Sequence, residues 1–339
     1  MPQHTVSRRE LLRCLGAAAA TPLLGGVASR WAPVLAADGP DVGPFIDTHV
    51  HLVNVRLPGV PESLLTPDKK TRLAPFDAVE NPRGAQQLAS VIQAEMETAK
   101  VGQALCMPRH EISDQDPLGI KEIEALSGLV SGVQLHPIGF AHPERFDCDH
   151  LALVEAVLKQ GRVKGLKVYL GYLHYGPNHV GYHPYYKLAA QYHTPVIFHT
   201  GDTYSAKAKV KYAHPRLIDE VAVDFPDTRF VLAHFGNPWI TDAAEVVYKN
   251  RNVWADLSGI LIGDAESFRK SAQDGALERV VNRIKQGIEY TEAPEKFLFG
   301  SDWPLAPVAV YREFIEQLFP KNLHPAVFRD TAQHVFFDA

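Results

Sequence analysis

Residues 45–51, Phe-Ile-Asp-Thr-His-Val-His, join a short apolar run to two imidazoles that stand two positions apart. On a β-strand, positions i and i+2 point to the same side, so His49 and His51 would converge on one point in space. Such a pair can hold a metal ion, or it can belong to a half-buried structural strand. Three later segments favour the metal site, because each places a His or an Asp directly after an apolar run: 198–202, 233–236 and 300–304.

Short apolar runs alternate with amphipathic segments along most of the chain. The eight runs cover 45–52, 102–107, 133–140, 164–170, 195–200, 229–235, 253–258 and 296–302. The amphipathic segments include 86–99, 120–129, 150–160, 215–225, 241–249 and 277–288. Runs that are nearly continuous in Val, Ile, Leu and Phe are typical of parallel strands buried on both faces.

Eight strand–helix units between residues 45 and 302 match the roughly 250 residues of a (β/α)₈ barrel. We therefore predict an α/β fold, a single-domain (β/α)₈ TIM barrel. A doubly wound open sheet is the alternative. It is disfavoured because no Gly-rich phosphate-binding loop follows the first strand.

The first 36 residues predict a cleavable export signal that precedes the barrel. Arg8 and Arg9 are followed by two leucines, a mildly apolar stretch over 14–28 and small residues at 34–37. This pattern resembles a twin-arginine signal, with a general secretory signal and a membrane anchor as alternatives. An anchor needs about 20 strongly apolar residues, and this stretch is shorter and rich in Ala and Gly. We expect a signal peptide over 1–36, a barrel domain over 37–339, and a periplasmic or secreted protein without a stable membrane anchor.

The charge balance excludes nucleic acid as a partner. The formal net charge is −5, and residues 1–36 contribute four arginines against one glutamate, so the barrel domain alone is more acidic. An acidic surface repels a phosphate backbone. The expected partners are a small-molecule substrate and the twin-arginine export machinery, with a homodimer left open. Cys106 and Cys148 lie outside the leader and can pair or stay free.

Lys167 lies within one of the predicted strands, where its neighbours indicate its direction. Lys167 and Tyr169 share one face of run 164–170, while Leu166 and Val168 share the other. An outward ammonium would meet the apolar helices, so we expect Lys167 to face the barrel interior. There it could position an anionic substrate or be carboxylated to bridge two metals. The alternative is a lysine that snorkels from a strand end.

Two loops are candidate walls of a substrate site, and a third is notable for its lysines. The segment 53–84 is Pro-rich and long for a connection, which is typical of a lid or functional loop. Residues 171–186 carry several Tyr and His side chains suited to holding a ring or planar acid. Residues 202–214 contain lysines at 207, 209 and 211, and alternate lysines usually form a solvated face.

Together these segments resemble the amidohydrolase superfamily, in the amidohydrolase-related branch that includes lactone hydrolases and nonoxidative decarboxylases. Residues 47–51 are similar to the motif of its strand 1, 196–201 to strand 5, 232–236 to strand 6 and 299–304 to strand 8. The resemblance extends from residue 45 almost to the C-terminus. One departure is Thr331-Ala332, where the family often has Asn-Ala before a final Phe, and we expect it to affect packing more than chemistry.

The resemblance implies one set of ligands for a single divalent metal: His49, His51, His199 and Asp302. It also implies two catalytic groups, His234 and Asp302. Three imidazoles and a carboxylate suit Zn²⁺, with Mn²⁺ and Fe²⁺ as alternatives, and Zn²⁺ lowers the pKa of a bound water to about 7. The expected substrate-binding residues are Lys167, Tyr169 and Trp303.

We expect a metal-dependent hydrolase that uses a metal-activated water on a C–O or C–N bond, in a lactone, ester or amide of a small carboxylated substrate. The ligands alone do not settle the reaction, because the family decarboxylases use a similar site. The alternatives are a nonoxidative decarboxylase and an exported metal-binding barrel without activity.

Overall fold

The computed structural model describes residues 44–55, 73–75, 82–109, 114–203 and 205–338. The predicted export signal and its cleavage region lie outside these residues. No helix in the described ranges is long and apolar enough to cross a bilayer. Cys106 is buried, Cys148 is exposed, and both are free thiols.

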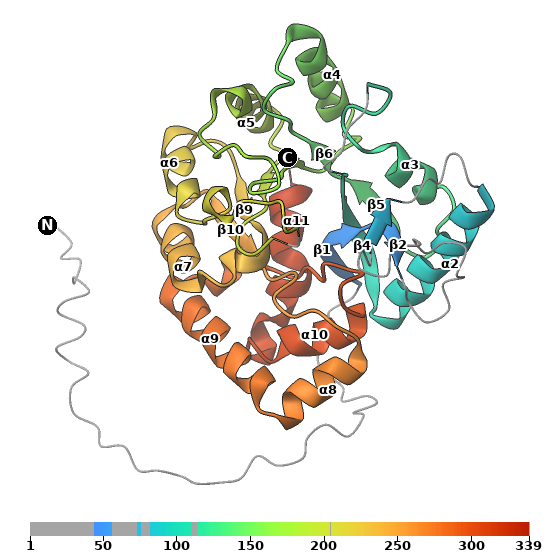
Figure 1. Ribbon diagram of the computed structural model, residues 1–339, viewed down its shortest axis with the longest axis vertical. Coiled ribbons are helices and arrows are strands. Elements are labelled where there is room, and N and C mark those ends of the chain that lie inside the picture. The colour runs from blue at the N-terminus through green and yellow to red at the C-terminus, as the bar shows by residue number, and fades with distance from the viewer. Residues whose placement is uncertain (1–43, 56–72, 76–81, 110–113, 204, 339) are drawn as a thin grey trace, which may run out of the picture. The chain divides into compact units, whose positions relative to one another are not determined.

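Parallel strands form the barrel, and each coincides with one of the eight predicted runs, although β4 begins one residue before its run (Figure 1). Strand β5 is followed after one residue by β6, so the two share the run 133–140. The strands of the barrel, in order, are β1 (Phe45–His51), β4 (Val101–Met107), β5 (Gln134–Pro137) with β6 (Gly139–Phe140), β7 (Leu166–Val168), β8 (Val196–Phe198), β9 (Phe230–Leu232), β10 (Val253–Asp256) and β11 (Phe297–Leu298).

Backbone hydrogen bonds close these strands into a barrel at two seams. Between β5 and β6 the chain changes neighbours: Ile138 N–H donates to the Cys106 carbonyl, and Gly139 N–H donates to the Gly165 carbonyl, each at 2.9 Å. Between β11 and β1, Asp302 N–H donates to the His49 carbonyl at 2.8 Å. The (β/α)₈ barrel predicted from the sequence is therefore confirmed.

Helices surround the strands, and all six predicted amphipathic segments are helical. The helices are α2 (Pro82–Thr98), α3 (Lys121–Ser127), α4 (Cys148–Lys159), α5 (His183–Gln191), α6 (Leu217–Asp224), α7 (Ile240–Lys249), α8 (Ala265–Gln273), α9 (Ala276–Thr291), α10 (Val308–Glu316) and α11 (Thr331–Phe336). Short single-turn elements also occur: η2 (Val180–Tyr182), η3 (Val210–Tyr212), η4 (Ala233–Gly236), η5 (Pro294–Lys296), η6 (Lys321–Leu323) and the π-helical η7 (Ala326–Asp330).

Both predicted substrate loops contain regular structure. The Pro-rich segment begins with β2 (Val53–Val55) and includes β3 (Leu73–Pro75), which pair as an antiparallel hairpin. Most of the residues between and after these strands lie outside the described ranges. The aromatic segment 171–186 runs through η2 into α5: Tyr182 in η2 and Tyr186 in α5 are fully buried, and Tyr186 packs against Phe225. The expectation that this whole segment is a substrate wall is therefore wrong for its second half, because helix packing takes up these rings.

Alternating side chains along the strands build two apolar layers. The inner layer fills the barrel and includes Ile46, Leu105, Ile138, Ile197, Val231 and Leu298. The outer layer lies between strands and helices and includes Leu166, Val168, Val196, Phe198, Phe230 and Leu232. Burial on both sides explains why these strands read as continuous apolar runs in the sequence.

Helix α11 closes the barrel at the N-terminal ends of the strands, and Figure 1 shows it near the middle of the ring of helices. Ala332, Val335 and Phe336 belong to the inner apolar layer. Arg229, just before β9, donates through Nη1 to the carbonyls of residues 334, 335 and 338 at 3.0–3.1 Å. These carbonyls lack helical partners at the end of α11, so the guanidinium satisfies them. At the departure from the family motif, the Thr331 hydroxyl donates to the Glu295 carbonyl at 2.9 Å.

Candidate metal and catalytic site

The predicted site residues lie at the opposite end of the barrel, where the strands end. His49 and His51 come from the end of β1, His199 follows β8, His234 lies in η4 after β9, and Asp302 follows β11. The register between β1 and β4 shifts between residues 47 and 50. This irregularity breaks the simple alternation of β1, so that His49 lies among the site residues although Ile46, three positions earlier, belongs to the inner apolar layer.

His49, His51 and Asp302 form one compact group of potential metal ligands. Their ligand atoms all lie within 4.8 Å of one another. Asp302 Oδ1 is 3.3 Å from His51 Nε2 and 3.8 Å from His49 Nε2. Burial would raise the pKa of Asp302, but the hydrogen bond with His51 and the nearby His234 and His49 hold this pKa well below its usual range. The convergence predicted from the sequence spacing is present.

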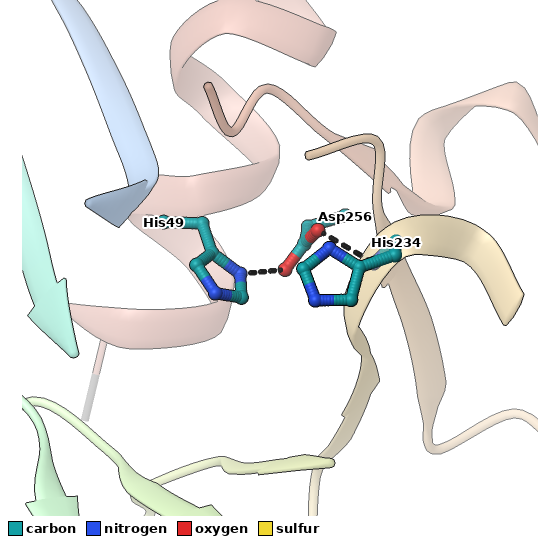
Figure 2. Close-up of side chains that lie close together, drawn as sticks. All are labelled: His49, His234 and Asp256. Atoms are coloured by element: carbon teal, nitrogen blue, oxygen red, sulfur yellow. Dashed lines mark hydrogen bonds and ion pairs between the residues drawn. The ribbon is translucent and has the colours of Figure 1, made fainter. Parts of the chain in front are cut away.

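A second group consists of His49, His234 and Asp256, and Figure 2 shows the carboxylate between the two imidazoles. Asp256 Oδ2 is 2.9 Å from His49 Nδ1, and Asp256 Oδ1 accepts the His234 backbone N–H at 3.0 Å. Asp256 was not among the residues predicted from the sequence. The pattern that indicated the other site residues, a His or an Asp at the end of an apolar run, also applies to Asp256 in the run 253–258.

His234 and Asp302 share an uncommon backbone conformation. Their φ angles are 63° and 58°, in the left-handed region that side chains with a Cβ seldom adopt. Asp302 Oδ2 lies 3.9 Å from His234 Nδ1, so the two functional groups face each other. Strained conformations of this kind concentrate at active sites, where the surrounding structure enforces them.

Gly259 explains how closely these two side chains approach the backbone. A Cβ at this position would lie 2.5 Å from Asp302 Oδ2 and 2.9 Å from His234 Nδ1. Gly259 also has a φ of +60°. Only glycine fits there without moving the carboxylate or the imidazole.

His199 lies beside the ligand group rather than within it. Its Nε2 is 2.8 Å from the Asp202 carbonyl and its Nδ1 is 3.2 Å from His234 Nε2. The ring of Tyr172 meets the His199 ring edge-on, with centroids 4.8 Å apart. Burial lowers the pKa of His199 well below its usual range. The structure therefore brings His199 next to His234 but not into contact with Asp302.

Lys167 is fully buried at the centre of the site. Its Nζ lies 3.4 Å from His49 Nε2 and 5.4 Å from the centre of the Tyr169 ring. Burial lowers the pKa of Lys167 to about 8, although Asp256 and Asp302 oppose this shift. The prediction that this lysine faces the barrel interior is confirmed, and the snorkelling alternative is wrong because no part of the side chain reaches solvent.

Tyr169 is a buried side chain that borders the site, whereas the side chain of Trp303 belongs to the outer apolar layer. The Tyr169 hydroxyl donates a very short hydrogen bond to the Pro108 carbonyl, and its ring lies edge-on to that of Tyr172. Trp303 follows Asp302 directly and is fully buried. The predicted solvated face at residues 207, 209 and 211 is confirmed, since all three lysines are exposed.

The side chains present fit a divalent cation. His49 can donate its Nδ1–H to Asp256, which leaves Nε2 unprotonated on the side of Asp302, where Lys167 Nζ lies 3.4 Å away in the metal-free site. His51 Nε2 and both Asp302 oxygens complete a set of nitrogen and oxygen donors that suits Zn²⁺, Mn²⁺ or Fe²⁺. The His51 side chain is 26% exposed, so the group can be reached from outside the barrel.

Residues 132–337 match the family model for the amidohydrolases. None of the curated protein sequences matches the chain. Among solved structures, similar chains include a protein described as a probable 2-pyrone-4,6-dicarboxylic acid hydrolase from Acinetobacter baumannii, with citric acid bound. It has 14% sequence identity and a TM-score of 0.55, and the match covers 86% of this chain and 98% of that one.

Two further solved structures show the range of chemistry among similar folds. A 5-carboxyvanillate decarboxylase from Sphingomonas paucimobilis has 15% identity and a TM-score of 0.54, with 87% of this chain and 99% of that chain covered. An amidohydrolase from Burkholderia multivorans with bound zinc has 14% identity and a TM-score of 0.58, with coverages of 87% and 98%. At these identities the likeness shows the barrel fold.

Proposed function

The chain belongs to the amidohydrolase family and is an enzyme, and from that premise we propose that it is a metal-dependent hydrolase. The reaction is the cleavage of a C–O or C–N bond in a lactone, ester or amide of a small carboxylated substrate. The observation that carries this proposal is the convergence of His49, His51 and Asp302 beside His234 at the end of the barrel where TIM-barrel enzymes hold their active sites.

We propose His49, His51, His199 and Asp302 as the ligands of one divalent ion. For His199 the support is the family resemblance, because its ring nitrogens contact Asp202 and His234. Zn²⁺ is the proposed metal, since it prefers imidazole and carboxylate ligands. A similar structure holds zinc and another holds manganese, so Mn²⁺ is the main alternative. When bound, the ion would supply a Lewis acid and lower the pKa of a water molecule.

The remaining groups have distinct roles in this proposal. Asp302 accepts the proton of the attacking water, and its low pKa keeps the carboxylate ionised and therefore able to accept. His234, 3.9 Å from Asp302, orients the water or donates to the developing oxyanion. Lys167 pairs with a substrate carboxylate, and a substrate anion would restore the pKa that burial lowers. Tyr169 would form an apolar wall for a planar substrate, and for Trp303 the support is its position next to Asp302 in the sequence.

A nonoxidative decarboxylase is the second candidate. The observation that favours it is the presence of 5-carboxyvanillate decarboxylases from two organisms among the similar structures. In that reaction the substrate carboxylate would lie at the metal and a proton would be delivered to carbon. Both the hydrolase and the decarboxylase among the similar structures are named for carboxylated ring compounds, which agrees with a cationic Lys167 beside aromatic walls.

Turnover in ¹⁸O-labelled water separates the two reactions. A panel of lactones, esters, amides and aromatic carboxylic acids would be incubated with the full chain, and the products analysed by mass spectrometry. Hydrolysis incorporates one solvent oxygen into the product. Release of CO₂ without oxygen incorporation would replace the hydrolase by the decarboxylase.

We also propose export by the twin-arginine route to the periplasm, on the basis of Arg8, Arg9 and the weakly apolar stretch behind them. Such export would bring the enzyme to substrates met before entry into the cytoplasm. Replacement of both arginines by Lys should leave the precursor in the cytoplasm, as seen by fractionation. Unchanged delivery would mean that another route is used.

A further inference from the structure

Asp256 is a fully buried carboxylate that touches two of the site histidines without a role in the reaction described above. Its Oδ1 accepts three donors: the backbone N–H of His234 and that of Ser258, each at 3.0 Å, and the Ser258 hydroxyl through a very short hydrogen bond. Its Oδ2 lies 2.9 Å from His49 Nδ1. Figure 2 shows this carboxylate between the His49 and His234 rings.

The contacts of Asp256 determine which nitrogen of His49 carries the proton. An ionised carboxylate only accepts hydrogen bonds, so the proton between Asp256 Oδ2 and His49 Nδ1 must belong to Nδ1. Two backbone N–H groups and the Ser258 hydroxyl converge on Oδ1, which is the set of donors that an ionised carboxylate accepts. His49 Nε2 is then unprotonated, and it is the nitrogen nearest Asp302.

We propose that Asp256 is a positioning residue that holds His49 in the Nδ1–H tautomer and thereby keeps Nε2 available to bind the metal. This inference rests on the proposed role of His49 as a metal ligand. Asp256 itself is not a ligand, because three hydrogen bonds occupy Oδ1 and the fourth holds Oδ2 against His49. A partner behind a ligating imidazole fixes the orientation of the ring and raises its basicity.

Asp256→Asn tests this role with almost no change in shape. The three donors around Oδ1 require an acceptor there, so the amide oxygen would occupy that position. The amide NH₂ would then face His49 Nδ1 and donate to it, which moves the imidazole proton to Nε2. The side chain would still fill its site, but His49 would present an N–H to the metal. We expect the affinity for Zn²⁺ and Mn²⁺ to fall about 10- to 100-fold.

The measurement is calorimetric titration of the metal-stripped full chain with each ion. Asp219→Asn is the matched control, since Asp219 is a carboxylate bonded to Lys249 and Asn250 far from the site, and it should leave metal affinity unchanged. Ser258→Ala removes a donor to Oδ1, together with the contacts of Ser258 Oγ at 3.1 Å from His49 Nδ1 and 2.9 Å from His234 Nδ1, but it keeps the contact of Oδ2 with His49. Its loss of metal affinity should therefore be clearly smaller than that of Asp256→Asn. An equal loss in the two variants would mean that the contact of Oδ2 with His49 does not set the affinity, and would overturn the proposal.

A second readout does not depend on the stability of the variant. With ¹⁵N-labelled histidine, the imidazole nitrogen shifts of the metal-free wild type report the tautomer, and His49→Gln identifies the His49 signals. We expect Nδ1–H; Nε2–H would overturn the proposal. If the wild type bound no divalent ion, the proposed function would fail while the tautomer remained measurable. If wild type and Asp256→Asn bound metal equally, only the role of Asp256 would fail.

Discussion

At the N-terminal ends of the strands, the barrel interior holds the apolar side chains of α11, whereas at the C-terminal ends it holds buried charges. The first end contains Phe336 and its inner-layer neighbours, which need no partners beyond close contact. The second contains Lys167 and Asp302, together with two residues in left-handed backbone conformations. Buried charges and strained backbone reduce stability, while apolar burial increases it.

The comparison shows that stability and chemistry are separated along the axis of one barrel. Substitutions at the two ends should therefore change different measured quantities. Those among the strand ends near Asp302 should lower turnover with limited effects on unfolding. Those around α11 should lower the free energy of unfolding and leave the kinetics of the remaining folded enzyme close to wild type.

The largest effect is expected for Asp302→Asn. The amide would weaken metal binding and could not accept the proton of the attacking water, so kcat should fall about a thousandfold or more. Steady-state kinetics of the metal-loaded protein measure this change. Near-normal kcat together with normal metal content would show that Asp302 is neither ligand nor base.

Phe336→Ala should have the largest effect at the other end. Phe336 is 5% exposed in the inner layer, and removal of a buried aromatic ring costs about 3–5 kcal/mol of unfolding free energy. Urea unfolding of the variant tests this expectation. The kcat of the folded fraction should stay close to wild type, and a large fall in kcat without loss of stability would contradict the separation of the two ends.

Gly259→Ala should lower turnover, because Gly259 lies at the catalytic end of the barrel. The new Cβ would displace Asp302 or His234, and a displacement of about 1 Å can cost about a hundredfold in rate. Gly275→Ala is a matched control: Gly275 also has a left-handed φ of +68°, but its nearest neighbour is the end of Arg279 at 3.5 Å. Both variants lose stability for the backbone conformation, and only Gly259→Ala should lose turnover.

Lys167→Met should change both the enzyme kinetics and the free energy of unfolding. It should raise KM for carboxylated substrates about tenfold and change KM little for neutral ones, because only the former lose a charge-assisted hydrogen bond.

In the metal-free wild type, burial lowers the pKa of Lys167 to about 8, so as pH rises the folded state loses the Lys167 proton before the unfolded state does. Wild-type stability should therefore rise between about pH 8 and pH 10.4. Urea unfolding of Lys167→Met across this range should lack that rise.

The smallest effect is expected for Arg229→Ala. The variant loses three hydrogen bonds to the end of α11, so unfolding free energy should fall by about 1–2 kcal/mol. Arg162→Ala removes a surface ion pair with Glu124 and should cost less. Equal losses in the two variants would mean that Arg229 contributes no more than a surface pair.

Strands and ligands that depend on local sequence could be predicted, while contacts set by distant parts of the chain could not. Each apolar run contains a strand because its residues are buried on both sides, and the spacing of His49 and His51 brings both imidazoles to Asp302. The partner of His49, Asp256, lies 207 residues away, and its contact depends on strand register around the barrel. The orientation of His199 depends on a backbone carbonyl at Asp202, for which no side-chain pattern gives a signal.

The start of α5 was missed for a related reason. Its tyrosines resemble a substrate wall in the sequence, because an aromatic ring suits a ligand and a helix interface equally. Tyr186 packs against Phe225, the C-cap residue at the end of α6, which is the next helix along the chain. This contact shows that the Tyr186 ring belongs to a helix interface. A cluster of aromatic residues therefore predicts burial more safely than it predicts function.

The alternation along β7 restricts the kinds of genetic change that this enzyme can accept. Lys167 points into the site, while Leu166 and Val168 on either side belong to the outer apolar layer. Insertion or deletion of one residue within this three-residue strand would exchange the two faces. An ammonium would then be buried against the helices, and a leucine or valine would enter the site. Divergence of the family at this strand should therefore proceed by substitution, with insertions and deletions confined to the loops that follow the strands.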